Sequence, residues 1–192
     1  MTQLEGALVE ITTILDQLRV PYMLIGGLAV SLWGEPRATL DVDLSLWVEP
    51  ANLSSTVSAL CARITALPKD PLAFAVETRV LPVSSSGGVR VDLVFAALDA
   101  EKQAIGRGVP KQVGGKTVMV CSVEDLVLMK LISEREKDWE DARRLLRRFR
   151  NSIDGVYLEP RLTQLADALA RPGIVDLFRR ETRGSPEHGS AR

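Results

Sequence analysis

Cysteine and histidine are nearly absent from this chain. Its 192 residues include two cysteines and one histidine. Cys61 and Cys121 each stand alone among apolar residues, and His188 lies near the C-terminal end. A structural disulfide is therefore not expected. A zinc site is excluded, because such sites draw about four ligands mainly from these residue types.

Charge of one sign and long apolar runs are also lacking. The formal net charge is −1, so any basic surface that attracts nucleic acid must be local. No apolar run approaches the roughly 18 residues of a membrane span. The N-terminal segment carries acidic residues, unlike the basic start of a signal peptide. With 46% hydrophobic and 26% charged residues, we expect a globular, cytoplasmic protein with no membrane partner.

The first two thirds of the chain mix helical and strand patterns. Short connections such as 83–88 favour antiparallel neighbours. The periodicities predict helices at 3–18, 28–33 and 51–66, strands at 22–25, 40–48, 73–82 and 89–96, and a hairpin at 109–121 that turns at Gly114-Gly115. This order predicts an α/β (α+β) fold, with a mixed sheet flanked by helices.

The last third is helical in pattern. Ser122 followed by Asp125 indicates a capping box that opens a helix. The helical pattern continues to about residue 180 and is interrupted near Gly155 and Pro172. We therefore expect three parts, which are a core at 1–121, a helical region at 122–181 that completes the site, and a disordered tail at 182–192.

Two aspartates lie on one face of the strand at 40–48. Asp41 and Asp43 alternate with apolar residues, which places their carboxylates roughly 6–7 Å apart on the same side. Aspartate is depleted in strands, so the pair needs a reason. Such charges repel by about 2–3 kcal/mol at an effective dielectric constant of about 20, and by under ~1 kcal/mol in bulk water. A divalent cation would remove this repulsion in a cleft, whereas an open, solvated sheet face would carry the pair without one.

Asp92 offers a third carboxylate. In the strand at 89–96 the apolar residues share one face, and Arg90 and Asp92 share the other. If this strand neighbours the one at 40–48, three carboxylates converge. Two Mg²⁺ ions about 4 Å apart would suit these oxygen ligands and an in-line displacement at phosphorus.

A glycine pair lies one short helix before the first two aspartates. Gly26 and Gly27 allow backbone N–H groups to approach a triphosphate, and the helix that follows presents its positive N-terminus. Arg37 and Thr39, just before the strand, are candidate phosphate contacts. An ordinary loop arginine and a strand-entry threonine would give the same sequence.

These motifs resemble a known superfamily. The segment GGLAVSLWGEPRATLDVDLSL at 26–46 is similar to the signature of the polymerase-beta-like nucleotidyltransferases, with a later strand carrying the third aspartate. The segment SVEDLVLMKLISEREKDWEDARRLL at 122–146 resembles the C-terminal motif of the AbiEii-type branch, whose members are largely toxins of toxin–antitoxin pairs. The two segments and the third aspartate together span about 21–146, most of the chain.

The resemblance implies a magnesium-dependent transfer of a nucleoside monophosphate from an NTP. By it, Asp41, Asp43 and Asp92 would be the metal ligands. Lys130 would contact the nucleotide phosphates, and Asp138 would be a polar residue near the nucleotide. The acceptor would be an RNA such as tRNA, and a cognate antitoxin protein would be a partner. The sequence departs from many relatives at Gly27, where they carry serine, so one hydroxyl contact to phosphate is missing while the backbone donors remain.

Other interpretations of the second segment stay open. Lys130 lies off the centre of an apolar stripe and also fits an ordinary exposed lysine. A solvated ion-pair network around a helix start would equally explain Arg135, Lys137, Asp138 and Asp141. Five arginines lie within 143–150, with a predicted buried face opposite them at Ala142, Leu145, Leu146 and Phe149. These arginines fit a contact with RNA or a partner protein, but their pattern favours a solvated helix face.

Three functions therefore compete. The first is nucleotidyl transfer to RNA by a toxin. The second is transfer to a small molecule such as an aminoglycoside, or to a partner protein. The third is a catalytically silent antitoxin or nucleotide-binding module. The complete set of three aspartates argues against the third, because a silent relative would be expected to lose a ligand first.

Overall fold

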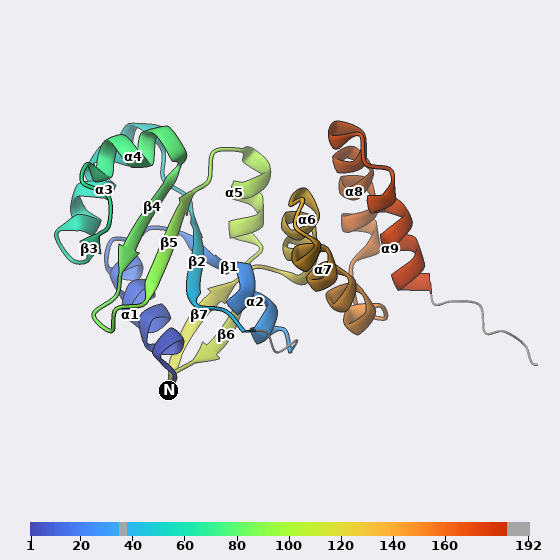
Figure 1. Cartoon of the computed structure of the whole chain (residues 1–192), viewed down its shortest axis with the longest axis horizontal. Helices are drawn as coiled ribbons and strands as arrows, with labels where there is room; N and C mark the ends of the chain where they lie inside the picture. The colour runs from blue at the N-terminus through green and yellow to red at the C-terminus, as the bar shows by residue number, and fades with distance from the viewer. Residues whose placement is uncertain (35–37, 184–192) are drawn as a thin grey trace, which may run out of the picture. The chain divides into compact units, whose positions relative to one another are not determined.

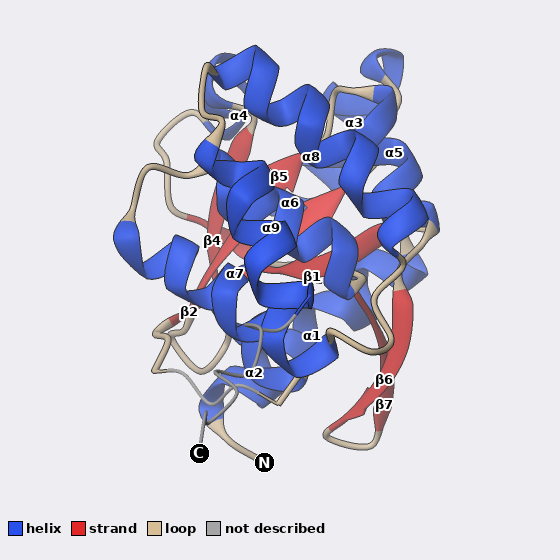
Figure 2. Cartoon of the chain, turned by 90° about the vertical axis from the view of Figure 1, so that its right-hand side faces the viewer, coloured by secondary structure: helices blue, strands red, loops and turns tan. Residues whose placement is uncertain are grey.

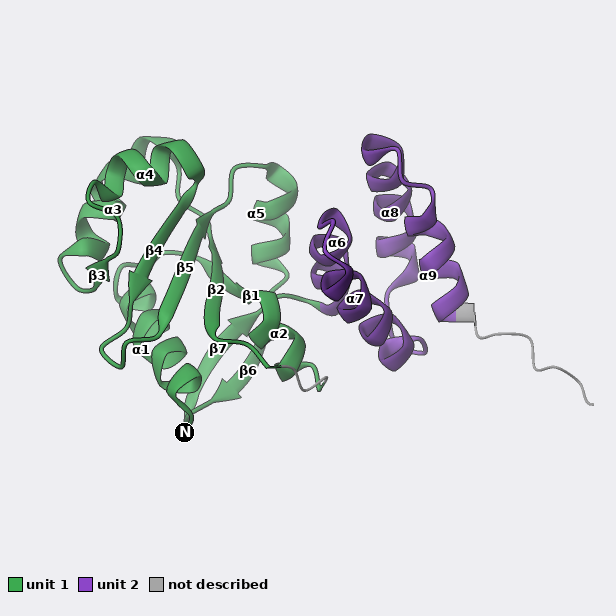
Figure 3. Cartoon of the chain, viewed as in Figure 1, with its two compact units in different colours: residues 1–122 green, residues 123–192 purple. Residues whose placement is uncertain are grey.

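The computed structural model describes residues 1–34 and 38–183. Two compact units divide the chain, one formed by Met1–Ser122 and the other starting at Val123 (Figure 3). They are called unit 1 and unit 2 below. The predicted phosphate contact Arg37 lies outside the described residues.

Unit 1 is built on one mixed sheet. Within the described residues the sheet has seven strands in the order β3-β4-β5-β2-β1-β7-β6 (Figure 1). The strands are β1 Tyr22–Ile25, β2 Asp41–Leu46, β3 Thr65–Ala66, β4 Val80–Ser84, β5 Arg90–Phe95, β6 Val109–Val113 and β7 Lys116–Val120. Most neighbours are antiparallel, but β2 is parallel to β5, and β1 is parallel to β7. The predicted α/β fold with a mixed sheet is confirmed.

Helices flank this sheet. The described helices of unit 1 are α1 Gln3–Gln17, α2 Gly26–Leu32, α3 Leu53–Cys61, α4 Pro71–Thr78 and α5 Asp99–Gly106, with a 3₁₀ turn at Pro50–Asn52. The apolar stripe of α1 is fully buried at Leu8, Ile11 and Leu15. Because α1 contacts β2 and β7, this stripe covers the middle of the sheet.

One face of the central strands forms the core. The alternating residues Val42, Leu44 and Leu46 are completely buried, as the period of two predicts. In register, Leu44 lies beside Leu24 of β1 and Leu93 of β5. The aspartates of the same strands lie on the opposite face of the sheet. Burial of the apolar residues therefore determines which face carries the aspartates.

The elements predicted at 73–82 and 51–66 differ from the structure in type or in length. The strand predicted at 73–82 is wrong in its first part, which forms α4. Asp70 caps this helix by accepting a hydrogen bond from the Ala73 amide at 3.0 Å, and Pro71 occupies its first turn. The helix ends at Arg79 in the left-handed conformation, and β4 follows. The helix predicted at 51–66 is also too long, because it ends at Cys61 before β3.

The hairpin at the far edge of the sheet is confirmed. Figure 2 shows β6 and β7 side by side, and their register closes on Gly114 and Gly115. Both glycines have positive φ, 56° and 84°, as a two-residue hairpin turn requires.

Unit 2 is helical, as predicted. Its described helices are α6 Val123–Ile132, α7 Glu136–Phe149, α8 Gly155–Leu169 and α9 Gly173–Arg183. The breaks expected near Gly155 and Pro172 are present. The last helix includes the first two residues of the predicted tail, and 184–192 lie outside the described residues. None of the helices in the described ranges is long and apolar enough to span a membrane.

Candidate active site

Three carboxylates meet on the acidic face of the sheet. Because β2 and β5 are parallel neighbours, Asp43 lies directly beside Asp92, with Asp41 two residues away on the same face. One oxygen from each of the three aspartates lies within 4.8 Å of the others. The convergence predicted from the sequence is therefore confirmed, and we call these residues the aspartate triad.

The chemistry of the triad fits a hard divalent cation. All three side chains offer carboxylate oxygens, which Mg²⁺ prefers, and each is partly exposed. Such ions commonly use one or two carboxylates and complete their shells with water and substrate phosphates. The partial exposure of the triad leaves access for such ligands.

Asp43 is held by close packing against a glycine. Strand β1 runs antiparallel to β2, so Ile25 lies beside Asp43, and Gly26 follows at the start of α2. A β-carbon built on Gly26 would lie 1.9 Å from Asp43 Oδ2. The backbone of Gly26 also has φ 69°, a conformation that other residues rarely adopt. The glycine thus makes room for a carboxylate, a role that the glycine pattern alone did not reveal.

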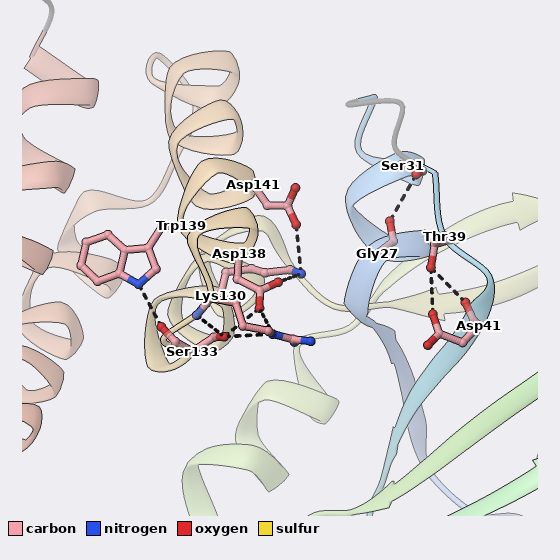
Figure 4. Close-up of polar contacts among 10 residues, drawn as sticks. Gly27, Ser31, Thr39, Asp41, Lys130, Ser133, Asp138, Trp139 and Asp141 are labelled. Atoms are coloured by element: carbon pink, nitrogen blue, oxygen red, sulfur yellow. Dashed lines mark hydrogen bonds and ion pairs between the residues drawn. The ribbon is translucent and has the colours of Figure 1, made fainter.

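Asp41 is oriented by a threonine. The Thr39 hydroxyl donates a hydrogen bond to Asp41 Oδ1 at 2.9 Å (Figure 4). In the structure the hydroxyl of Thr39 contacts this carboxylate, and the predicted contact of Thr39 with phosphate stays a prediction. This bond engages one oxygen of Asp41 and restricts rotation of the carboxylate.

Asp92 is paired with an arginine on its own strand. Arg90 Nε donates to Asp92 Oδ1 at 3.0 Å. The Arg90 side chain is 56% exposed and that of Asp92 is 19% exposed. The alternation of residues along β5 predicts that Arg90 shares the acidic face with Asp92. This pattern alone does not assign a role to Arg90.

Helix α2 starts at Gly26 itself, two residues earlier than predicted. Gly27 is buried, and its carbonyl accepts a hydrogen bond from the Ser31 hydroxyl at 3.2 Å (Figure 4). The suggestion that the amides of Gly26 and Gly27 approach a triphosphate stays a prediction.

Lys130 lies in a buried ion cluster of unit 2. Its ammonium is 2.6 Å from Asp138 Oδ1 and 3.0 Å from Asp141 Oδ2 (Figure 4). The side chains of all three residues are at most 8% exposed. The sequence allows a solvated ion-pair network that does not include Lys130, whereas the structure buries Asp138 and Asp141 and places Lys130 between them. A contact between Lys130 or Asp138 and a nucleotide stays a prediction.

The electrostatics of Asp138 follow from this cluster. Burial by itself raises the pKa of Asp138. Hydrogen bonds from Lys130 and Ser133, together with the positive charges of Lys130 and Arg135, outweigh burial and hold the pKa below its usual value. Asp138 is thus ionised at neutral pH and anchors α7 to α6.

The arginines of α7 are largely engaged with acidic residues. Ion pairs join Arg143 and Arg144 to Glu140, Arg143 to Glu136, and Arg147 to Glu181. On the predicted buried face, Ala142, Leu145 and Leu146 are fully buried, while Phe149 is only half-buried. This pairing supports the interpretation that the arginines form a solvated helix face, because neighbouring glutamates offset much of the positive charge of the arginines.

Comparison with known proteins shows similarity at the level of the fold. No family model and no curated protein matches the sequence. An antigenic nucleotidyltransferase-like protein from Paracoccidioides brasiliensis has a TM-score of 0.54 at 18% identity, with 91% of each chain covered. The antibiotic-resistance factor ANT(2'')-Ia gives 0.56 at 14% identity, covering 86% of this chain and 92% of that one. ANT(2'')-Ia has also been solved with adenylyl-2''-tobramycin.

A third similar structure is the lincosamide antibiotic adenylyltransferase LnuA with lincomycin bound. Its TM-score is 0.50 at 17% identity, covering 76% of this chain and 96% of that one. At these identities the likeness concerns the fold. The chain therefore shares the fold of these nucleotidyltransferase-like structures and carries an aspartate triad on its sheet.

Proposed function

We propose that the protein is a magnesium-dependent nucleotidyltransferase that moves a nucleoside monophosphate from an NTP to an acceptor hydroxyl. The observation that carries this proposal is the meeting of Asp41, Asp43 and Asp92 within 4.8 Å on neighbouring strands. The nucleotidyltransferase-like fold supports the same conclusion.

The residues of the triad would bind and align rather than react covalently. Asp41, Asp43 and Asp92 would hold two Mg²⁺ ions, which supply positive charge to the triphosphate and to the attacking and leaving oxygens. The acceptor oxygen would bond to the α-phosphorus as the bond to the bridging oxygen breaks. Pyrophosphate leaves with the electron pair of that bond, and the proton of the acceptor hydroxyl passes to solvent. Thr39 and Gly26 contribute by fixing the carboxylates of Asp41 and Asp43 before substrate arrives.

A catalytically silent module is a poorer account of the same site. Three like charges held together weaken the fold unless something offsets their repulsion. Packing at Gly26 and the hydrogen bond from Thr39 add local constraints that a solvated sheet face does not need. Such constraints are expected where carboxylates must keep a fixed geometry.

For the acceptor, the resemblance of the sequence leads us to propose RNA, with tRNA as the first candidate. In that case the protein would act as the toxin of a toxin–antitoxin pair and would bind a cognate antitoxin. The arginine-rich stretch at 143–150 supports an anionic acceptor, and its exposed members include Arg148 on α7 and Arg150 just after this helix.

A second candidate acceptor is a small hydroxylated molecule. The glutamate partners of Arg143, Arg144 and Arg147 favour it, because they weaken the basic surface on which the RNA hypothesis depends. Two of the similar structures are an antibiotic-resistance factor and an antibiotic adenylyltransferase.

One experiment tests the reaction and separates the acceptors. The full chain is incubated with each α-³²P-labelled NTP and Mg²⁺, together with total RNA, tRNA, or a panel of aminoglycosides and lincosamides. Label in RNA supports the first acceptor, and label in an antibiotic supports the second. Absence of pyrophosphate release with every NTP and acceptor, together with no binding of Mg²⁺–NTP, would remove the proposed function.

A further inference from the structure

Arg90 is a basic side chain on the acidic face of the sheet. It shares this face with Asp92, two residues on, and lies beside Asp41 in the register of β2 and β5. Its Nε donates to Asp92 Oδ1 at 3.0 Å, so it is bonded to one member of the triad and adjacent to another.

This placement changes the charge of the site. Three carboxylates and one guanidinium leave a formal excess of two negative charges. Without Arg90 the excess would be three, and the repulsion among the aspartates would be larger. The guanidinium therefore serves as a counter-ion for the triad before any cation is bound.

The ion pair is also easy to break. Arg90 is 56% exposed, and an ion pair with one well-hydrated partner contributes little to stability. When a divalent cation approaches the triad, it competes with Arg90 for Asp92 and repels the guanidinium. A triphosphate bound with that cation would offer oxygens of the geometry that a guanidinium prefers.

We propose that Arg90 is an exchangeable counter-ion that passes from Asp92 to a phosphate oxygen of the incoming nucleotide. It is then a nucleotide-binding residue that the sequence motifs did not assign. The proposal rests on the proposed function. It predicts that Arg90 has opposite effects on two affinities. Arg90 weakens binding of the divalent cation alone, and it strengthens binding of the cation together with its nucleotide.

The test measures both affinities in the same variants. Mn²⁺ alone and Mn²⁺ with each α,β-methylene NTP are titrated into the full chain by calorimetry. The variants are Arg90→Gln, which removes the charge, and Arg90→Lys, which keeps it. Arg63→Gln is the matched control, because Arg63 is an exposed arginine of unit 1 whose guanidinium bonds to the Ala59 carbonyl on α3.

For Arg90→Gln we expect Mn²⁺ alone to bind about tenfold more tightly, as removal of one charge near a divalent ion implies. The same variant should bind the Mn²⁺–nucleotide about tenfold more weakly, because a charge-assisted hydrogen bond to phosphate is lost. Arg90→Lys should leave the affinity for Mn²⁺ unchanged and weaken nucleotide binding less. Arg63→Gln should change neither.

Other results would overturn the proposal in distinguishable ways. Equal weakening of both affinities would make Arg90 a fixed positioning residue for Asp92. No change in either would make the pair an ordinary surface ion pair. Failure of the proposed function itself would appear separately, as an Asp92→Asn variant that binds Mn²⁺ as well as the unmodified chain.

Discussion

The α-carbon of Gly26 lies against the carboxylate of Asp43. A β-carbon at position 26 would come within 1.9 Å of Asp43 Oδ2 and 2.8 Å of its Cγ. The end of β1 and the triad are thus packed together, and the glycine is required by two independent features, the positive φ and the contact. This relationship connects the glycine motif directly to the aspartate triad.

Gly26→Ala should therefore damage the site more than the fold. The left-handed conformation costs an alanine about 1–2 kcal/mol, and the clash must push Asp43 away from Asp41 and Asp92. We expect Mn²⁺ affinity to fall at least about tenfold while the chain stays folded, as measured by calorimetry and thermal unfolding. Gly106→Ala is the control, because a β-carbon there has no neighbour within 4 Å. Unchanged Mn²⁺ binding in Gly26→Ala would contradict the packing argument.

Removal of single charges from the triad should abolish activity without unfolding the protein. Asp41→Asn, Asp43→Asn and Asp92→Asn keep the side-chain shape and relieve repulsion. We expect nucleotidyl transfer to fall by about 10³-fold or more, since alignment and electrostatics provide most of the catalysis in phosphoryl transfer. The melting temperature should stay the same or rise slightly. Near-full activity in any of the three variants would show that the residue is not a ligand.

Lys130→Met should destabilise unit 2. The substitution leaves Asp138 and Asp141 buried without their shared cation, and breaking a buried pair in this way costs about 3–5 kcal/mol. The control is Arg144→Met, which removes an exposed pair with Glu140 and should cost under about 1 kcal/mol. Urea unfolding measures both. If Lys130→Met keeps its stability but weakens NTP binding, the phosphate contact predicted from the sequence is the better role.

The lowered pKa of Asp138 sets a pH window for stability. A carboxyl with a folded pKa below its unfolded value, about 3.9, stabilises the fold fully above that value. The contribution is lost as the pH falls through the folded pKa. The difference in free energy of unfolding between the unmodified chain and Asp138→Asn should thus be largest near neutral pH and shrink below about pH 4. A difference that does not change with pH would show that the Asp138 charge contributes nothing.

The local periodicity of the sequence was enough to predict much of the fold. The alternation in β2 and β5 predicted which faces carry the aspartates, because a period of two admits only one assignment once the apolar face is buried. The pairing of β2 with β5 was left open, since strand order depends on contacts distant in the chain. The register that brings Asp43 beside Asp92 came from the structure.

The errors have equally local causes. The closely spaced apolar residues of α4 predict a strand. The segment forms a helix whose start depends on the N-cap at Asp70. Helix α5 was not predicted, since only Ala104 and Ile105 of it are buried and the apolar pattern is weak. Lys130 is buried because it pairs with Asp138 and Asp141 of α7, which lie beyond a break in the helix. The apolar periodicity of 123–132 alone therefore places Lys130 only at the edge of the buried face.

The central claim is that the aspartate triad holds divalent cations for transfer of the α-phosphoryl group. The most direct measurement follows label from α-³²P and γ-³²P NTPs into the acceptor panel, with Mg²⁺ or with chelator, for the unmodified chain and Asp92→Asn. The account predicts that α-label alone is transferred, that pyrophosphate appears in equal amount, and that chelator or the substitution abolishes both. Transfer of γ-label, or α-label transfer that survives chelator and Asp92→Asn, would contradict it.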